Sequence, residues 1–163
     1  RISLPLAPRQ CVTSWSTTRG SHPLANEEAI ASEFLSDGLV LLTEAPGTEI
    51  PYEVRSGGVL TDPSFPLTIL VNRGSASASE VVSGALKEAG RALLIGENTF
   101  GKNTVQQRFS LSNGGAVKVT IARWVTPDGT DFGEDGISPD IEAEVPRDLT
   151  PEEIVAFVNT LTG

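Results

Sequence analysis

The segment that most restricts the fold of this chain runs from residue 66 to residue 97. "PLTILVN" (66–72) is apolar and β-branched, as is typical of a strand covered on both faces. A helix is predicted next, because apolar residues recur at helical spacing up to Gly90: Ala78, Val81, Val82, Ala85, Leu86 and Ala89. "RALLIGEN" (91–98) then returns as a strand. Strand, helix and strand in this order imply a parallel pair of strands joined by a crossover, and therefore an α/β fold.

Further elements lie on both sides of this unit. We expect a helix in "EEAIASEFL" (27–35), a buried strand in "GLVLLTEA" (38–45) and a more exposed strand in "IPYEVR" (50–55). Two alternating runs around an Asn-Gly step predict a hairpin, namely "VQQRFSLS" (105–112) and "AVKVTIARWVT" (116–126). A loop follows. A last helix is predicted in "TPEEIVAFVNTLT" (150–162), with Thr150 as its N-cap, Pro151 as its first residue and Glu153 completing a capping box.

Composition excludes several classes of function. The 163 residues suffice for one domain, and 21 acidic against 12 basic residues give a net charge of −9. This balance argues against a nucleic-acid partner and against an anionic membrane surface. A single cysteine, Cys11, excludes an internal disulfide, and a single histidine, His22, excludes a site built from several histidines. Because the chain starts at Arg1 and has no methionine, we interpret it as a fragment or a processed product.

A cluster of serines, "GSASASE" (74–80), lies where the strand is expected to pass into the helix. One interpretation is a capping box, in which the side chains of Ser77 and Glu80 accept hydrogen bonds from backbone N–H groups at the start of the helix. The other is a nucleophile, since a serine at the carboxyl edge of a parallel sheet lies beside helix N–H groups that can stabilise an oxyanion. A nucleophilic serine needs a base. His22 is one candidate, and Lys102 is another, because burial lowers the pKa of an ammonium group.

The stretch "GENTFGKN" (96–103) is close to a phosphate-binding loop, and it follows a strand as that motif requires. Asn103 lacks the hydroxyl that would bind magnesium. The residues after Lys102 alternate like a strand and do not open a helix. A nucleotide-binding domain is therefore the remote alternative.

Two long motifs resemble a known family. "VNRGSASASEVVSGALKEAGRALLIGENTFGKNTVQ" (71–106) is similar to the core motif of the carboxyl-terminal processing peptidases, also called tail-specific proteases, of serine peptidase family S41. "ARWVTPDGTDFGEDGISPDIEAEV" (122–145) is similar to the family's second signature. The resemblance implies a fold of stacked β-β-α units like that of crotonase and ClpP, with a mixed sheet. It also implies a polypeptide substrate cut near its carboxyl terminus, with no metal or other cofactor.

The resemblance also implies the roles of the reacting residues. Ser77 would attack the peptide carbonyl, Lys102 would be the general base, and Gln106 would orient that lysine. Acylation of the serine and hydrolysis of the acyl-enzyme would follow. A catalytically impaired homologue that binds peptide ends is the alternative within the same family.

Other residues are assigned more indirectly. The family often carries supporting acidic residues where Glu80 and Glu88 lie, although both also fit the exposed face of the predicted helix. Gly101 precedes the implied base and is a further supporting residue. The backbone N–H groups of Ala78 and Gly20 are the implied oxyanion donors.

The amino-terminal segment departs from the family. We divide the chain into an atypical segment, residues 1–26, and a catalytic core, residues 27–163. Family members carry an apolar strand ending in Asp-Leu-Arg-x-Asn-x-Gly-Gly, where this chain has "STTRGSHPLAN" (16–26). Loss of that strand would expose one side of the sheet, and loss of one oxyanion donor reduces rate by about 10²–10³-fold. The abrupt change suggests a reading-frame error or a truncated gene product, which resequencing of the coding region would test.

Three further expectations follow from the family. A PDZ domain is expected in the full-length protein. An extracytoplasmic location, periplasmic or membrane-associated, also fits family members. A homo-oligomer is an expectation that does not rest on the family. Asn103 stands where the family usually has glycine, which would shift the loop that holds Lys102.

Overall fold

The computed structural model describes residues 11–13 and 25–163, and in them the strands form two separate sheets. The first sheet is parallel, with strands in the order β1 (Cys11–Thr13), β4 (Leu67–Val71), β5 (Leu93–Gly96) and β8 (Ile141–Glu142). The second is antiparallel, in the order β3 (Thr48–Glu53), β2 (Leu39–Ala45), β7 (Ala116–Val125) and β6 (Thr104–Ser110). The helices are α1 (Ala25–Ser32), α2 (Ala78–Glu88) and α3 (Pro151–Thr162).

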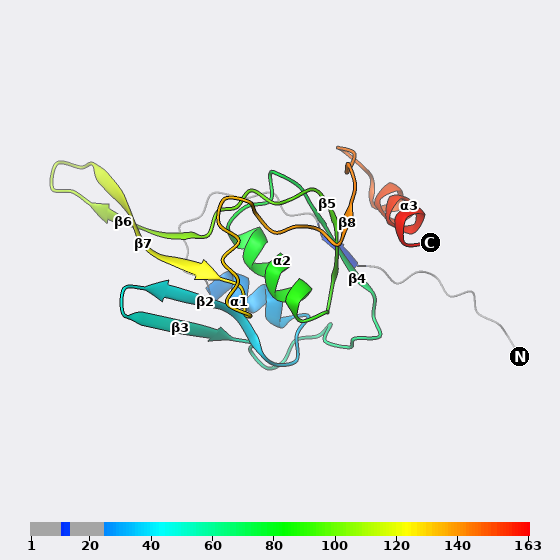
Figure 1. The fold of residues 1–163 in the computed structure, drawn as a ribbon, viewed down its shortest axis with the longest axis horizontal. Helices are drawn as coiled ribbons and strands as arrows, with labels where there is room; N and C mark the ends of the chain where they lie inside the picture. The colour runs from blue at the N-terminus through cyan, green and yellow to red at the C-terminus, as the bar shows by residue number, and fades with distance from the viewer. Residues whose placement is uncertain (1–10, 14–24) are drawn as a thin grey trace, which may run out of the picture.

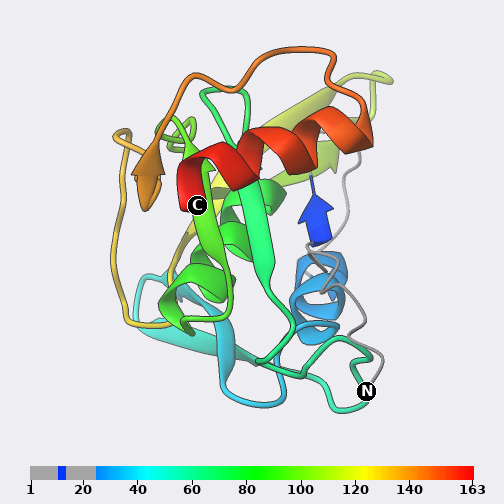
Figure 2. The same ribbon diagram turned by 90° about the vertical axis from the view of Figure 1, so that its right-hand side faces the viewer.

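Helices cover both faces of the parallel sheet. Helix α2 lies between the two sheets, and α3 lies on the opposite face of the parallel sheet (Figures 1 and 2). All five residues of β4 are buried, Thr68 among them, which explains why its sequence lacks the alternation of a half-exposed strand. Alternate β4 residues face the two sides, so Ile69 joins the core around α2 and Leu70 packs with Val158 of α3. The helix that carries the serine cluster is therefore held between two layers.

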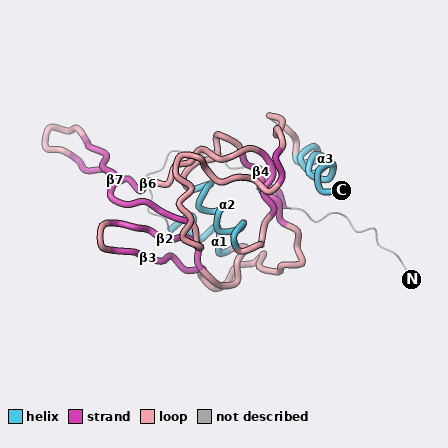
Figure 3. The backbone as a smooth tube through the Cα atoms, in the orientation of Figure 1, coloured by secondary structure: helices cyan, strands magenta, loops and turns pink. Residues whose placement is uncertain are grey.

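The structure confirms the predicted β-α-β unit, since β4 and β5 are parallel neighbours joined through α2. It also confirms the hairpin of β6 and β7, and the capping box of Thr150 and Glu153 at the start of α3. A long, mostly irregular connection joins β7 to α3, as expected (Figure 3). Among the described residues, no helix has both the length and the apolar character needed to cross a membrane.

Two expectations about the sheets were wrong. Parallel and antiparallel pairs were expected in one mixed sheet, but they lie in separate sheets, because α2 occupies the space between them. The side of β4 expected to be exposed pairs with β1, whose three residues run parallel to residues 67–69 of β4. Cys11–Thr13 is too short to be recognised as a strand without its partner, and the same holds for the two-residue strand β8.

One arginine joins two loops to the end of α2. Arg91 donates hydrogen bonds to the backbone oxygens of Phe34 at 3.2 Å, Leu60 at 2.9 Å and Phe65 at 2.9 Å. Its planar guanidinium group can serve several carbonyl groups at once, which a lysine ammonium at the end of a flexible chain cannot do in the same geometry.

We therefore expect Arg91→Lys to destabilise the protein. The substitution leaves backbone carbonyl groups without their charged donor, and a loss of about 2–3 kcal/mol in the free energy of unfolding is expected. Urea unfolding measures this loss, with Arg147→Lys on the exposed surface as the matched control. Equal unfolding midpoints for the two variants would show that Arg91 does not hold the loops.

A second link joins α1 to the residues after β3. Arg55 donates two hydrogen bonds to the Glu28 carboxylate, at 2.9 and 2.8 Å, and this interaction lowers the pKa of Glu28 below its ordinary 4.5. A lowered pKa in the folded state stabilises the protein above pH 4.5, and that contribution is lost as the pH falls through the folded-state value.

Glu28→Gln should consequently cause a small loss of stability at pH 7 that disappears in acid. The effect is small because Arg55 is half-exposed and water screens the pair. Melting temperatures of parent and variant between pH 7 and pH 3 test this expectation. A difference that persists unchanged below pH 4 would mean that the carboxylate charge is not its source.

Candidate active site

Ser77 lies at the turn between the central parallel strand and α2, in a backbone conformation that is rare for its residue type. Its φ and ψ angles are 56° and −112°. Among the described non-glycine residues, Asp148 alone shares a positive φ. Such a conformation costs about 1–3 kcal/mol and persists where the surrounding structure enforces it. A serine on a strained strand-to-helix turn is also the arrangement that exposes a nucleophile at the edge of a sheet.

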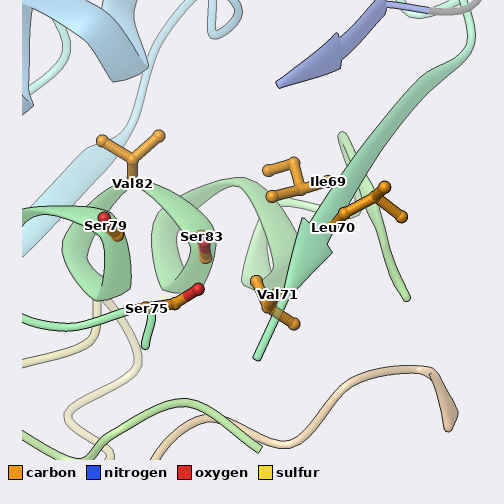
Figure 4. A pocket seen from close by; sticks show the side chains of 7 residues that line it. All are labelled: Ile69, Leu70, Val71, Ser75, Ser79, Val82 and Ser83. Atoms are coloured by element: carbon orange, nitrogen blue, oxygen red, sulfur yellow. The ribbon is translucent and has the colours of Figure 1, made fainter. Parts of the chain in front are cut away.

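The three serines of the cluster have different surroundings. Ser75 is buried, and its hydroxyl oxygen accepts the backbone N–H of Asn72 at 3.2 Å. Ser75 and Ser79 line a cavity of about 10 Å³, which has room for about one water molecule (Figure 4). Ser77 is half-buried, does not line that cavity, and forms the predicted capping box with Glu80, whose carboxylate accepts the Ser77 backbone N–H at 2.6 Å. Of the three serines, Ser77 is therefore the one whose hydroxyl lies outside the cavity.

A backbone donor lies beside that hydroxyl. The N–H of Ala78 has no hydrogen-bond partner within the described residues, whereas the N–H groups of Ser77, Glu80 and Val81 are all engaged. An unpaired N–H in the first turn of a helix, adjacent to a nucleophile, can bind a developing oxyanion.

Glu80 is fully buried, which corrects its assignment to the exposed face of the helix. One carboxylate oxygen, Oε2, accepts the backbone N–H of Ser77 at 2.6 Å and that of Lys102 at 2.9 Å. The other, Oε1, accepts the Thr99 hydroxyl at 2.6 Å and the backbone N–H of Gly101 at 2.6 Å. A buried carboxylate needs such partners. Helical periodicity did not reveal the burial of Glu80, because three of its four partners come from a loop 19 to 22 residues away.

This carboxylate joins the serine turn to the loop that carries Lys102. Both backbones bond to the same oxygen atom, so the two segments are held together at their amide groups. Lys102 itself is half-buried and forms no ion pair within the described residues. The Glu80 carboxylate contacts the Lys102 backbone, which leaves the ammonium group available for another role.

The second sequence motif supports the same loop from outside. The Thr99 hydroxyl accepts the backbone N–H of Ile137 at 2.7 Å while it donates to Glu80. Gly101 and Gly136, both with positive φ, allow the two loops to approach: a Cβ at Gly101 would lie 2.6 Å from the Glu134 backbone, and one at Gly136 would lie 2.3 Å from the Thr99 oxygen. Thr99 was not singled out from the sequence, although it lies inside the first motif, two residues before Gly101.

Gln106 and Asn103 follow Lys102 along the chain. Gln106 is exposed on β6, and its side-chain amide donates to the Thr120 hydroxyl at 3.5 Å. Asn103 forms two hydrogen bonds to the second motif. Its side-chain amide donates to the Asp131 carboxylate at 2.7 Å, and its backbone oxygen accepts the backbone N–H of Trp124 at 2.8 Å. Because β6 begins directly after Asn103, no helix opens there, and the phosphate-loop interpretation is wrong.

Other predicted site residues lie elsewhere. Glu88 is at the far end of α2, about 16 Å from Ser77 at 1.5 Å per residue, where it accepts the backbone N–H of Asp128 at 2.9 Å. It therefore supports the turn of the second motif and not the reacting groups. Gly20 and His22 lie outside the described residues. Within the described residues, no group of acidic, cysteine or histidine side chains could hold a metal ion.

A wide hollow of about 540 Å³ opens at the carboxyl ends of β5 and β8. Its polar lining includes Arg73, Glu97, Glu142 and Glu144. Arg73 also donates to the Thr99 backbone oxygen at 3.4 Å, so the hollow borders the loop that Glu80 holds.

Comparisons with known proteins identify related sequences. Residues 24–143 match the model of peptidase family S41. The chain is 45% identical over 114 residues to the chloroplastic C-terminal processing peptidase of Tetradesmus obliquus, an alignment covering 68% of this chain and 24% of that protein. It is 42% identical over 118 residues to the carboxyl-terminal-processing protease of Synechocystis sp., covering 72% of this chain and 27% of the relative.

A solved structure of a C-terminal processing protease is also similar to this chain. A photosystem II D1 C-terminal processing protease superposes with a TM-score of 0.69 at 35% identity, over 86% of this chain and 36% of that one. The chain spans about a quarter of the length of the Tetradesmus and Synechocystis relatives. Relatives include chloroplastic and bacterial processing proteases.

Proposed function

The chain belongs to peptidase family S41, and from this premise we propose that it carries the catalytic core of a serine endopeptidase that cleaves polypeptides near their carboxyl termini. The observation that carries the proposal is the strained turn at Ser77, tied through the buried Glu80 carboxylate to the loop of Lys102. The chain's homologues are named as processing peptidases, which gives the substrate class.

The proposed reaction begins with a proton transfer. Neutral Lys102 accepts the proton of the Ser77 hydroxyl as the Oγ atom attacks the carbonyl carbon of the scissile bond. The tetrahedral intermediate then collapses: the C–N bond breaks, the lysine returns the proton to the leaving amine, and an ester remains on Ser77. Water, deprotonated by Lys102, then attacks the ester, the bond between the acyl carbon and Ser77 Oγ breaks, and the new carboxyl terminus is released. Lys102 returns its proton to Ser77 Oγ, which restores the starting state.

Two groups assist this chemistry. The unpaired N–H of Ala78 stabilises the oxyanion, and a second donor would come from the segment that contains Gly20. Gln106, four residues beyond Lys102 in sequence, orients the lysine. We further propose the crotonase-like and ClpP-like family fold for residues 27–163, an extracytoplasmic site of action, and a full-length protein with a PDZ domain.

Degradation of an unfolded reporter tests the proposal. The 163-residue chain is incubated with a reduced, denatured protein of known sequence, and products are mapped by mass spectrometry. Cuts clustered near the carboxyl terminus are expected. If nothing is cut, the same chain is tested for binding to peptides with free carboxyl ends. Binding without cleavage would support the impaired homologue. The absence of both cleavage and binding would contradict both functions.

A further inference from the structure

The hairpin of β6 and β7 carries an unusual pair of charges. Arg108 and Lys118 are direct partners in the antiparallel register, so both side chains lie on the same face. Like charges directly opposite each other destabilise a pair of strands. Neither side chain has an ion pair or hydrogen bond within the described part of the chain, and both residues are exposed.

The charge of the hairpin is the reverse of that of the chain. Residues 104–125 contain three basic residues and no acidic one, although acidic residues exceed basic ones by 21 to 12 over the whole sequence. Arg123, the third basic residue, is neutralised by Glu44 at 2.7 Å and Asp131 at 2.5 Å. The hairpin end projects away from the body (Figure 1), and within the described residues no acidic side chain forms an ion pair with the remaining two cations.

The same face of the hairpin also carries Gln106. Its partner in the register is Thr120, two residues from Lys118, and the side chains of Gln106 and Thr120 are in contact at 3.5 Å. Residues two apart in a strand point the same way and lie about 7 Å from each other. The opposite face is apolar, with Phe109, Val117 and Val119 exposed by 41–44%. Arg108 and Lys118 therefore lie next to Gln106 and Thr120 on the same face of the hairpin.

We propose that Arg108 and Lys118 form a carboxylate-binding subsite for the polypeptide substrate. The inference rests on the proposed function, which places Gln106 beside the reacting groups. A substrate carboxylate bound between the two cations would relieve their repulsion and gain charge-assisted hydrogen bonds. The carboxylate could be the terminal one or an acidic side chain, since both offer the same two oxygen atoms.

Binding measurements separate these sources. Four fluorescent 12-residue peptides of one apolar sequence are used: free or amidated at the carboxyl terminus, each with Asp or Asn at one central position. Fluorescence anisotropy with the Ser77→Ala chain should give about fivefold tighter binding for each peptide with the recognised carboxylate. The difference between free and amidated peptides identifies a terminal carboxylate, and that between Asp and Asn identifies a side chain.

Three variants test the assignment. Arg108→Gln should abolish the preference for the carboxylate, whereas Arg147→Gln, the same change on an exposed arginine elsewhere, should retain it. Arg108→Glu should also abolish it, while the melting temperature stays equal or rises, because an opposite-charge pair with Lys118 replaces a repulsive one. Loss of preference in both Arg108 variants with an intact fold is the expected result.

Equal binding of all four peptides, or a preference that survives Arg108→Glu, would overturn the subsite. Neither result depends on cleavage, so this failure is distinct from that of the proposed function. Absence of cleavage by the parent chain, with the carboxylate preference present, would instead leave the subsite standing and contradict the peptidase.

Discussion

Ser77→Ala and Lys102→Ala are each expected to reduce kcat for peptide cleavage by at least about 10⁴-fold, because loss of a nucleophile or its base removes the covalent route altogether. Both variants should retain most of the stability of the parent, since Glu80 bonds to the backbone of Ser77 and not to its side chain, and Lys102 has no ion pair in the described residues. Initial rates on a fluorogenic peptide, with melting temperatures measured beside them, test both statements.

Ser79→Ala is the matched control, because Ser79 lies in the same cluster but lines the small interior cavity. It should keep activity to within a few-fold. The double variant of Ser77 and Lys102 should be no less active than either single one, as is expected for residues that act as a unit. Multiplied losses in the double variant would mean that the two residues contribute to rate separately.

Glu80→Gln is expected to cause the second large effect, although it removes only a charge and changes the shape little. Four donors converge on this carboxylate, two on each oxygen. A side-chain amide has only one acceptor oxygen, so its NH₂ group would face two hydrogen-bond donors in either orientation. We expect a loss of about 3 kcal/mol in the free energy of unfolding, with a decrease of at least about 10²-fold in kcat, because the Ser77 turn and the Lys102 loop lose their shared anchor.

Glu88→Gln gives the comparison within the same helix. Glu88 bonds only to the backbone N–H of Asp128 among the described residues, so the change should cost less than about 1 kcal/mol and leave kcat nearly unchanged. To separate positioning from stability, the rates are measured well below the melting temperature of each variant. Should Glu80→Gln unfold more easily but retain full kcat when folded, Glu80 would serve stability alone.

Local patterns in the sequence were sufficient for most elements of the fold. The apolar run of β4, the helical spacing over 78–89 and the Asn-Gly turn each predicted one element, and each was confirmed. Thr150 and Glu153 even predicted the cap of α3. These features depend on residues close together in the chain, where steric and hydrogen-bonding rules act directly.

Features that depend on distant partners were not predictable in the same way. Glu80 has the helical position of a solvent-facing residue, and its burial follows from donors in the 99–102 loop. Strands β1 and β8 are too short to have a pattern of their own and exist through pairing with β4 and β5. Ser77 was recognised as a candidate from motif and position, whereas its positive φ could only come from the structure.

Trapping of the acyl-enzyme tests the central claim most directly. The chain is mixed with a peptide ester, quenched in acid within the first turnover, digested and analysed by mass spectrometry. The account predicts the acyl group on Ser77, accumulating in the parent and absent from Ser77→Ala. An acyl group on Ser75 or Ser79, or undiminished turnover by Ser77→Ala, would contradict it.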